Sequence, residues 1–311
     1  MLSHKHLIDI DEYSVEEIVE ILDTAESFKE VNDRTIKKLP TLRGRTIINL
    51  FLEPSTRTRT SFEIAGKRLS ADVINFSASF SSTKKGETLA DTGETLDAMD
   101  ADLVVVRSKQ EGAPRLLARH IDAHIVNGGD GKHQHPTQAL LDAFTIRQHK
   151  GGFAGLKVGI VGDIAHSRVV GSLVPLLVKL GAEVTVIGPP TLMPARPDIL
   201  GCACSYTLDD VLPELDIVYM LRIQMERLEG APIPSLREYQ MLYGIGRDRL
   251  QMLKDDALIM HPGPINRGVE LTAEAADSER AVILDQVNAG VAVRMAVMYL
   301  LLGGDSNGIA S

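Results

Sequence analysis

Residues 46–63 read TIINLFLEPSTRTRTSFE and join a predicted strand to a predicted helix. Thr46–Phe51 is apolar and rich in β-branched residues, as a strand buried on both faces should be. Behind the turn, Phe62, Ala65 and Leu69 recur at helical spacing. The turn therefore opens a helix, and such a strand–turn–helix unit is typical of a parallel α/β fold.

The turn itself carries hydroxyls and two arginines, in the order Ser55-Thr56-Arg57-Thr58-Arg59. A helix N-terminus already holds about half a positive charge and prefers acidic neighbours, so arginines there are unexpected on stability grounds. They make sense if an anion binds the exposed N–H groups. The alternative is an ordinary Ser-capped helix with solvated arginines. The close packing of hydroxyls and guanidinium groups favours the anion, and we predict a phosphate site.

The whole chain has the composition of a globular protein, with 44% hydrophobic and 24% charged residues. Its 311 residues suggest two domains, each able to bury a core of its own. The formal charge of -9 argues against a nucleic-acid surface, which requires a basic face. A phosphate site must then be a local concentration of arginine and lysine on an acidic background.

Neither a membrane segment nor a metal site is predicted. No apolar run approaches the ~18 residues that a transmembrane helix needs, and residues 1–6 lack the apolar core of a signal peptide. Cys202 and Cys204 are too close together for an ordinary disulfide and too few for a zinc site. We interpret them as thiols in a reducing cytoplasm, and no pattern indicates a cofactor.

Strands and helices alternate along the chain. Strands are predicted at 46–51, 73–76, 103–106, 124–127, 157–161, 184–187, 217–220 and 258–260. Helices are predicted from 15, at 88–99, 114–120 and 136–148, from 167, and at 287–302. We expect two doubly wound parallel-sheet domains, 1–150 and 151–286, with the active site in the cleft between them. The segment 287–311 should hold a C-terminal helix that packs back on the first domain.

Ligands of such sheets bind beyond the carboxyl ends of the strands. Arg107, His135, Arg168 and Arg222 all fall there. Alone, Arg107 could be a surface arginine and His135 an ordinary core or surface histidine. Two arginines at strand ends of the second domain suit bidentate capture of carboxylates. For the hydroxyl- and lysine-rich segment 81–86, taken alone, the default interpretation is a solvated loop.

Several common catalytic motifs are missing. Gly159–Asp163 lacks the G-x-G-x-x-G spacing of a dinucleotide site, and Walker A and Gly-x-Ser-x-Gly patterns do not occur. What remains is a phosphate site in the first half, a carboxylate site in the second, and the donors Thr58, Arg107 and His135. This set suits acyl or carbamoyl transfer from a phosphorylated carbonyl compound, with phosphate as the leaving group.

Three motifs together resemble the carbamoyltransferase family: the Ser55–Arg59 turn, Lys85-Gly86-Glu87-Thr88, and His135-Pro136-Thr137-Gln138. The resemblance extends over essentially the whole chain. Met260–Pro264 and Arg222-Ile223-Gln224 are similar to the aspartate-specific branch of that family. Ornithine-specific members carry a cysteine directly after the corresponding histidine, whereas here that position is a proline, so ornithine is disfavoured.

The resemblance implies a role for each matched residue. The phosphate of carbamoyl phosphate would be held by Ser55, Thr56, Arg57 and Thr58. Its carbonyl would be polarised by Thr58, Arg107 and His135, and its amide would be contacted by Gln138.

Aspartate would be bound by Lys85, Arg168, Arg222 and Gln224. The carbamoyl group would be positioned by the backbone of Pro262, Gly263 and Pro264. Arg57, Thr58, Lys85, Arg107 and His135 would be the catalytic set.

The same resemblance implies an assembly and a pathway. Ser81 and Lys85 would reach into the active site of a neighbouring subunit of a homotrimer. The product would be N-carbamoyl-L-aspartate, in the committed step of pyrimidine synthesis. The chain resembles a separate catalytic subunit, and a dihydroorotase or a regulatory chain is a possible partner. A carbamoyltransferase for another amino acid, a nucleotide-binding α/β protein and an inactive scaffold stay open as alternatives.

Overall fold

The computed structural model describes residues 2–32, 34–77, 87–223 and 233–303. The chain forms two compact units. Unit 1 comprises Met1–Phe144 with Asn288–Ser311, and unit 2 comprises Thr145–Val287. Both divisions fall inside helices, the first within α5 (Pro136–Lys150) and the second within α10 (Ile283–Leu301). No helix in the described part of the chain combines the length and apolarity needed to cross a bilayer.

Unit 1 is built on a parallel sheet of four strands in the order β2-β1-β3-β4. The strands are β1 (Thr46–Phe51), β2 (Asp72–Ser77), β3 (Leu103–Ser108) and β4 (His124–Asp130). In the register of β1 and β3, Phe51 lies beside Arg107. The carboxyl ends of β1, β3 and β4 are therefore neighbours at one edge of the sheet.

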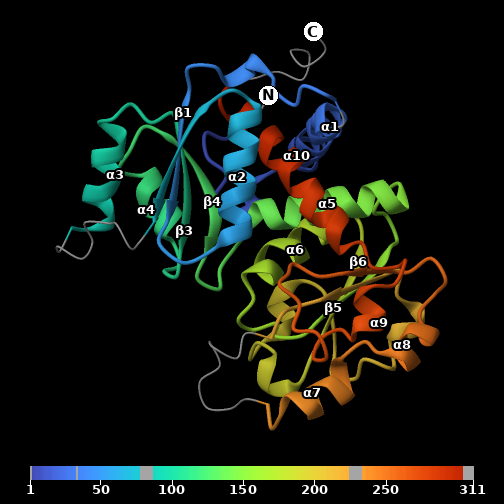
Figure 1. Ribbon diagram of the computed structural model, residues 1–311. Coiled ribbons are helices and arrows are strands. Elements are labelled where there is room, and N and C mark those ends of the chain that lie inside the picture. Colours follow the sequence, from blue (N-terminus) through green and yellow to red (C-terminus); the bar gives the residue numbers. More distant parts are fainter. Residues whose placement is uncertain (1, 33, 78–86, 224–232, 304–311) are drawn as a thin grey trace. The chain divides into compact units, whose positions relative to one another are not determined.

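Helices cover both faces of this sheet (Figure 1). They are α1 (Val15–Asn32), α2 (Thr56–Arg68), α3 (Leu89–Asp97), α4 (Ala113–Ala118), the later part of α10, and the short 3-10 turns η1 (Ile10–Glu12) and η2 (Pro40–Leu42). Leu96 of α3 and Leu117 of α4 pack with Ile48 and Val104 on one face. α2 packs on β1 and β2 from the other face. Because successive strand residues point to opposite faces, both faces of the sheet are apolar.

Unit 2 has a parallel sheet of five strands in the order β7-β6-β5-β8-β9. The strands are β5 (Lys157–Val161), β6 (Glu183–Ile187), β7 (Ala203–Ser205), β8 (Ile217–Met220) and β9 (Leu258–Met260). The helices are α6 (Arg168–Lys179), α7 (Leu236–Tyr243), α8 (Arg247–Met252) and α9 (Ala273–Ala276), with the 3-10 turns η4 (Pro190–Leu192), η5 (Pro197–Leu200) and η6 (Leu212–Glu214). The predicted fold class, two parallel α/β units, is confirmed. The edge strand β7 was not predicted.

Candidate functional site

The predicted phosphate site lies where β1 runs into α2. Ser55 is the N-cap residue of α2, with an extended backbone, and the helix begins at Thr56. Among the described residues, the Ser55 side chain makes no capping hydrogen bond, and the first turn of α2 holds no acidic residue. The arrangement differs from an ordinary Ser-capped helix, in which the hydroxyl accepts from a first-turn N–H group. A helix end of this kind is suited to an anion.

Arg107, near the end of β3, connects this turn to the neighbouring strand ends. Its Nε donates to Glu53 Oε1 at 2.8 Å. Its Nη1 donates to Thr58 Oγ1 at 3.2 Å and to the Gly128 carbonyl at 3.1 Å, and lies 3.5 Å from His135 Nε2. The structure therefore brings together Thr58, Arg107 and His135, as the sequence predicted. A ligand oxygen close to Nη1 would lie within reach of all three side chains.

Glu53 fixes the guanidinium plane. Its side chain is 4% exposed and that of Arg107 is 15% exposed, so this ion pair is largely desolvated. A guanidinium is planar and its donors have fixed directions. With Nε directed at Glu53, the orientation of Nη1 toward Thr58 and His135 is set by the pair.

The turn before His135 is held by a buried carboxylate, that of Asp130. It accepts hydrogen bonds from Gly112 N (2.8 Å), Asn127 Nδ2 (2.8 Å) and Gln134 N (3.2 Å). Burial raises the pKa of Asp130, but the hydrogen bonds of His133, Asn127 and Gly112 outweigh it, so the pKa lies below its ordinary value. Gln134 in turn accepts from Ile10 N at 2.7 Å. His135 therefore follows a turn whose first residue, Asp130, and last residue, Gln134, are both held by hydrogen bonds.

Gln138 lies in the first turn of α5 and is 9% exposed. Its Nε2 donates to Asp142 Oδ1 at 3.0 Å, one helical turn later. Because the amide nitrogen is engaged there, the side-chain oxygen is the end that can accept a hydrogen bond from a ligand.

In unit 2, the predicted residues lie at the carboxyl ends of three adjacent strands. Arg168 is the first residue of α6, after β5, and is 6% exposed. Arg222 follows β8, and the segment Pro262–Pro264 follows β9. Since β5, β8 and β9 are parallel neighbours, these residues share one edge of the sheet. Gly162, at φ +138°, allows the backbone after β5 to pass close to Leu221, which follows β8. A Cβ at position 162 would lie 2.9 Å from Leu221 Cβ.

Three predicted residues, Ser81, Lys85 and Gln224, lie outside the described residues. Side chains that the sequence did not single out include Glu53, Asp130 and Glu270. Glu53 could have been found, because it follows β1 at the same sheet edge as Arg107. Asp130 and Glu270 gave no signal in the sequence, because each also binds a backbone N–H group of a distant segment, that of Gly112 and of Ile223 respectively.

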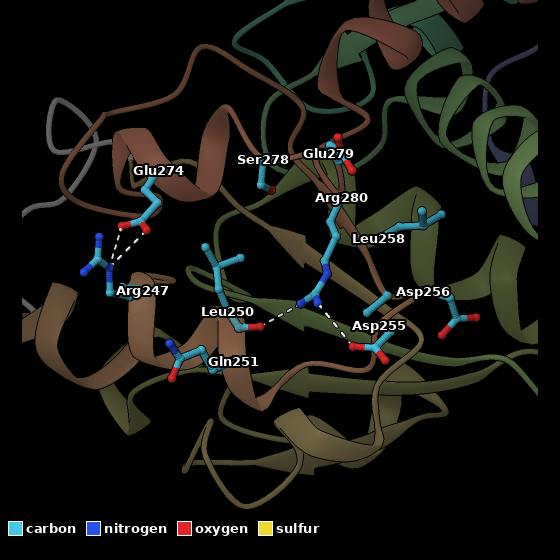
Figure 2. A pocket seen from close by; sticks show the side chains of 11 residues that line it. Arg247, Leu250, Gln251, Asp255, Asp256, Leu258, Glu274, Ser278, Glu279 and Arg280 are labelled. Atoms are coloured by element: carbon cyan, nitrogen blue, oxygen red, sulfur yellow. Dashed lines mark hydrogen bonds and ion pairs between the residues drawn. The ribbon is translucent and has the colours of Figure 1, made fainter.

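A pocket of about 770 Å³ opens elsewhere in unit 2 (Figure 2). Arg280 reaches across it to the Leu250 carbonyl, and Arg247 pairs with Glu274. Its charged lining residues are Arg247, Asp255, Asp256, Glu274, Glu279 and Arg280. Carboxylates outnumber guanidinium groups, so this pocket is poorly suited to a phosphate or a dicarboxylate. None of the described site residues line it.

Comparison with known proteins agrees with this geometry. Residues 5–148 match the family model described as aspartate/ornithine carbamoyltransferase, carbamoyl-P binding domain, and residues 154–301 match the Asp/Orn binding domain of the same family. The aspartate carbamoyltransferase catalytic subunit of Syntrophotalea carbinolica is 56% identical over 303 residues, covering 97% of both chains. That of Thermobifida fusca is 57% identical over 300 residues, covering 96% of both.

A solved structure is also similar. Aspartate transcarbamoylase from Trypanosoma cruzi, in complex with carbamoyl phosphate and aspartate, has a TM-score of 0.86 at 31% identity, and the match covers 94% of this chain and 95% of that one. Both family domains are matched in order, and the relatives are similar over nearly their whole length. The chain therefore belongs to the aspartate/ornithine carbamoyltransferase family.

Proposed function

We propose that this chain transfers the carbamoyl group of carbamoyl phosphate to the α-amine of L-aspartate, giving N-carbamoyl-L-aspartate and phosphate. The observation that carries the proposal is the convergence of Thr58, Arg107 and His135 at the N-terminus of α2. The aspartate carbamoyltransferases to which the chain is similar support aspartate as the acceptor. The product enters pyrimidine biosynthesis.

The phosphate end of the substrate binds at the start of α2. The residues are Ser55, Thr56, Arg57 and Thr58. First-turn N–H groups have no intrahelical acceptor, and they point along the axis at the positive end of the helix dipole. The hydroxyl groups add short hydrogen bonds. The guanidinium group of Arg57 adds a full positive charge and can donate to two phosphate oxygens at once.

The carbonyl oxygen is polarised by Thr58, Arg107 and His135, and Gln138 accepts from the carbamoyl amide. The aspartate amine attacks the carbonyl carbon, a C–N bond forms, and negative charge develops on the oxygen of a tetrahedral intermediate. Donors that are already oriented stabilise that charge without reorganising. The C–O bond to phosphate then breaks, and the departing phosphate can accept the proton that the amine loses.

The two carboxylates of aspartate are bound by Arg168, Arg222 and Gln224, and the backbone of Pro262–Pro264 positions the carbamoyl group. Arginine suits this task because its planar fork matches a carboxylate in two hydrogen bonds. Holding the amine at the carbonyl carbon supplies much of the rate, because the reaction becomes effectively unimolecular.

The working unit in this proposal is a cytoplasmic homotrimer. Ser81 and Lys85 of one chain complete the site of the next, and Lys85 contacts both substrates. A dihydroorotase or a regulatory chain is the partner class that we propose for the trimer. The reaction as written consumes no co-substrate, since its atoms and charges balance with carbamoyl phosphate and aspartate alone.

The test is product formation by the purified chain. With carbamoyl phosphate and L-aspartate, we expect N-carbamoyl-L-aspartate and phosphate in equal amounts, identified by mass spectrometry and a phosphate assay. L-ornithine replaces aspartate in the control. Faster carbamoylation of ornithine would overturn the choice of substrate, and no product from either amino acid would overturn the proposed activity.

A further inference from the structure

Glu270 is a fully buried carboxylate in unit 2 that the proposed chemistry does not use. Its Oε1 accepts from Ile223 N at 2.8 Å and from Asn266 Nδ2 at 2.8 Å. Its Oε2 accepts from Asn266 N, also at 2.8 Å. Both oxygens are thus engaged by donors from two separate chain segments.

These two segments are the ones that carry the proposed aspartate site. Ile223 directly follows Arg222, and Asn266 is the second residue after Pro264. Asn266 Nδ2 also donates to the Ile223 carbonyl at 3.1 Å, which adds a direct bond between the segments. The backbone of Glu270 is anchored in turn, because its carbonyl accepts from Ile245 N at 2.9 Å.

A further contact involves the residue before Pro262. His261 Nε2 lies 3.9 Å from Glu270 Oε2, and both side chains are fully buried. His261 Nδ1 accepts from Gly263 N at 2.8 Å, so the imidazole itself shapes the turn after β9. Glu270 therefore contacts a residue on each side of the Pro262–Pro264 turn, His261 before it and Asn266 after it.

Stability alone does not explain a carboxylate here. Burial raises the pKa of Glu270, against the lowering effect of the bonds from Ile223 and Asn266. A buried charge carries a desolvation penalty, and an apolar residue of similar volume is often at least as stable. An apolar residue, however, cannot accept hydrogen bonds from the backbone N–H groups of two segments at once.

We infer that Glu270 is a positioning residue for aspartate, which holds the backbone at Arg222 and the Pro262–Pro264 turn at a fixed separation. The inference rests on the proposed function. Glu270 touches no substrate. It acts through Arg222 and the turn, so that the Arg222 guanidinium and the backbone of Pro262–Pro264 can contact the reactants in one site. A misplacement of about 1 Å in such a site can lower the rate by ~100-fold.

The first test is Glu270→Gln, which keeps the shape but replaces one acceptor oxygen with an NH2 group that faces N–H donors. We expect the KM for aspartate to rise by about ten-fold or more, while the KM for carbamoyl phosphate stays within about two-fold. The Ki of succinate, a dicarboxylate without an amine, should rise in parallel with the KM for aspartate. The matched control is Glu274→Gln, the same chemical change at an exposed residue paired with Arg247, which should leave all three constants unchanged.

A second variant, Asn266→Ala, keeps the carboxylate and its bonds to backbone N–H groups, and serves if Glu270→Gln does not fold. It too should raise the KM for aspartate selectively. Unchanged constants in a folded variant, or an equal rise in both KM values, would overturn the inference, even if the melting temperature falls. Wild-type chain that forms no carbamoyl-aspartate would instead overturn the proposed function, so the two failures are distinguishable.

Discussion

Arg57 is the second residue of α2, and its side chain is exposed in the described structure. If Arg57 donates to phosphate oxygens on which charge develops, as proposed, it should matter far more for the rate than for folding. We expect Arg57→Ala to lower kcat by about 100- to 1,000-fold and to change the free energy of unfolding by no more than about 0.5 kcal/mol. Steady-state kinetics at saturating carbamoyl phosphate measure the first effect and urea denaturation the second.

Lys67→Ala is the matched control for Arg57→Ala, because Lys67 is an exposed cation at the opposite end of the same helix, paired with Glu63. It should leave kcat unchanged. A near-wild-type rate for Arg57→Ala would remove that residue from the proposed catalytic set.

His133 provides a pH-dependent contribution close to the proposed site. Its Nδ1 lies 3.2 Å from Asp130 Oδ2, and its Nε2 lies 3.6 Å from Asp9 Oδ1. The hydrogen bond to Asp130 raises the pKa of His133 above its ordinary value. The stabilisation is thus fully present below the unfolded pKa of about 6.5 and is lost as pH rises through the folded pKa.

We therefore expect His133→Asn to lower the melting temperature more at pH 6 than at pH 9. Asp130 stays ionised over this range, because its own pKa lies below the ordinary value. Melting curves of the wild type and of His133→Asn, recorded at pH 6 and at pH 9, measure this difference. An effect of equal size at both pH values would show that the imidazolium charge contributes nothing.

The sequence identified the side chains that stand at strand ends, but not the residues that hold them. Thr58, Arg107 and His135 were predictable because each lies at the end of a strand or the start of a helix, at the same sheet edge. Asp130 and Glu270 were not, because their role depends on donors such as Gly112 and Ile223 that only the fold brings near. Glu53 lay within the quoted stretch, yet its pairing with Arg107 needs the register of β1 and β3.

At the scale of elements, the packing of α2 on the sheet depends on Gly66. A Cβ at this position would lie 2.6 Å from Val73 Cγ2, on the stiff β-branched side chain of a neighbouring strand. Alanine favours a helix by about 1 kcal/mol over glycine, but overpacking costs roughly 1–3 kcal/mol. We expect Gly66→Ala to be destabilising by about 1 kcal/mol on balance, as measured by urea denaturation.

The matched variants are Gly152→Ala and the double variant Gly66→Ala, Val73→Ala. Gly152 has nothing within 4 Å of an added Cβ, so its substitution should leave stability unchanged. In the double variant the shortened side chain at position 73 removes the clash, and the two substitutions should together cost less than the sum of the single ones. Strict additivity would contradict a contact between the two positions.

Element boundaries were predictable where capping or periodicity is strong. The first helix begins at residue 15 as predicted, because Ser14 and Glu17 form a capping box there: Ser14 N donates to Glu17 Oε2 at 3.0 Å, and Glu17 N donates to Ser14 Oγ at 3.2 Å. β7 was missed because it has only three residues, exposed or half-buried, and so no apolar alternation. The closing helix begins at Ile283, four residues before the predicted start at 287. The prediction was late because the first turn contains the 81% exposed Leu284 and so shows no apolar stripe.

At the scale of the whole molecule, the alternation of strands and helices was sufficient for the fold class. Parallel strands joined by helical crossovers leave few topologies, and each unit adopts one with all strands parallel. Family membership followed from three short motifs and is confirmed by the matched domains. The number of chains in the assembly has no such signature within one chain, so the trimer stays a prediction.

Shared sites in a trimer can be tested by mixing inactive chains. Lys85→Ala chains retain Arg57, and Arg57→Ala chains retain Lys85, so a site formed between one chain of each kind is complete. Each mixed ring of three holds one complete site, and random reassembly of equal amounts should restore about one quarter of wild-type activity. Mixing Arg57→Ala with His135→Ala is the control, because both lesions lie on the same side of the shared site and no ring can regain a complete one. Recovery in the control as well, or in neither mixture, would contradict sites shared through Lys85.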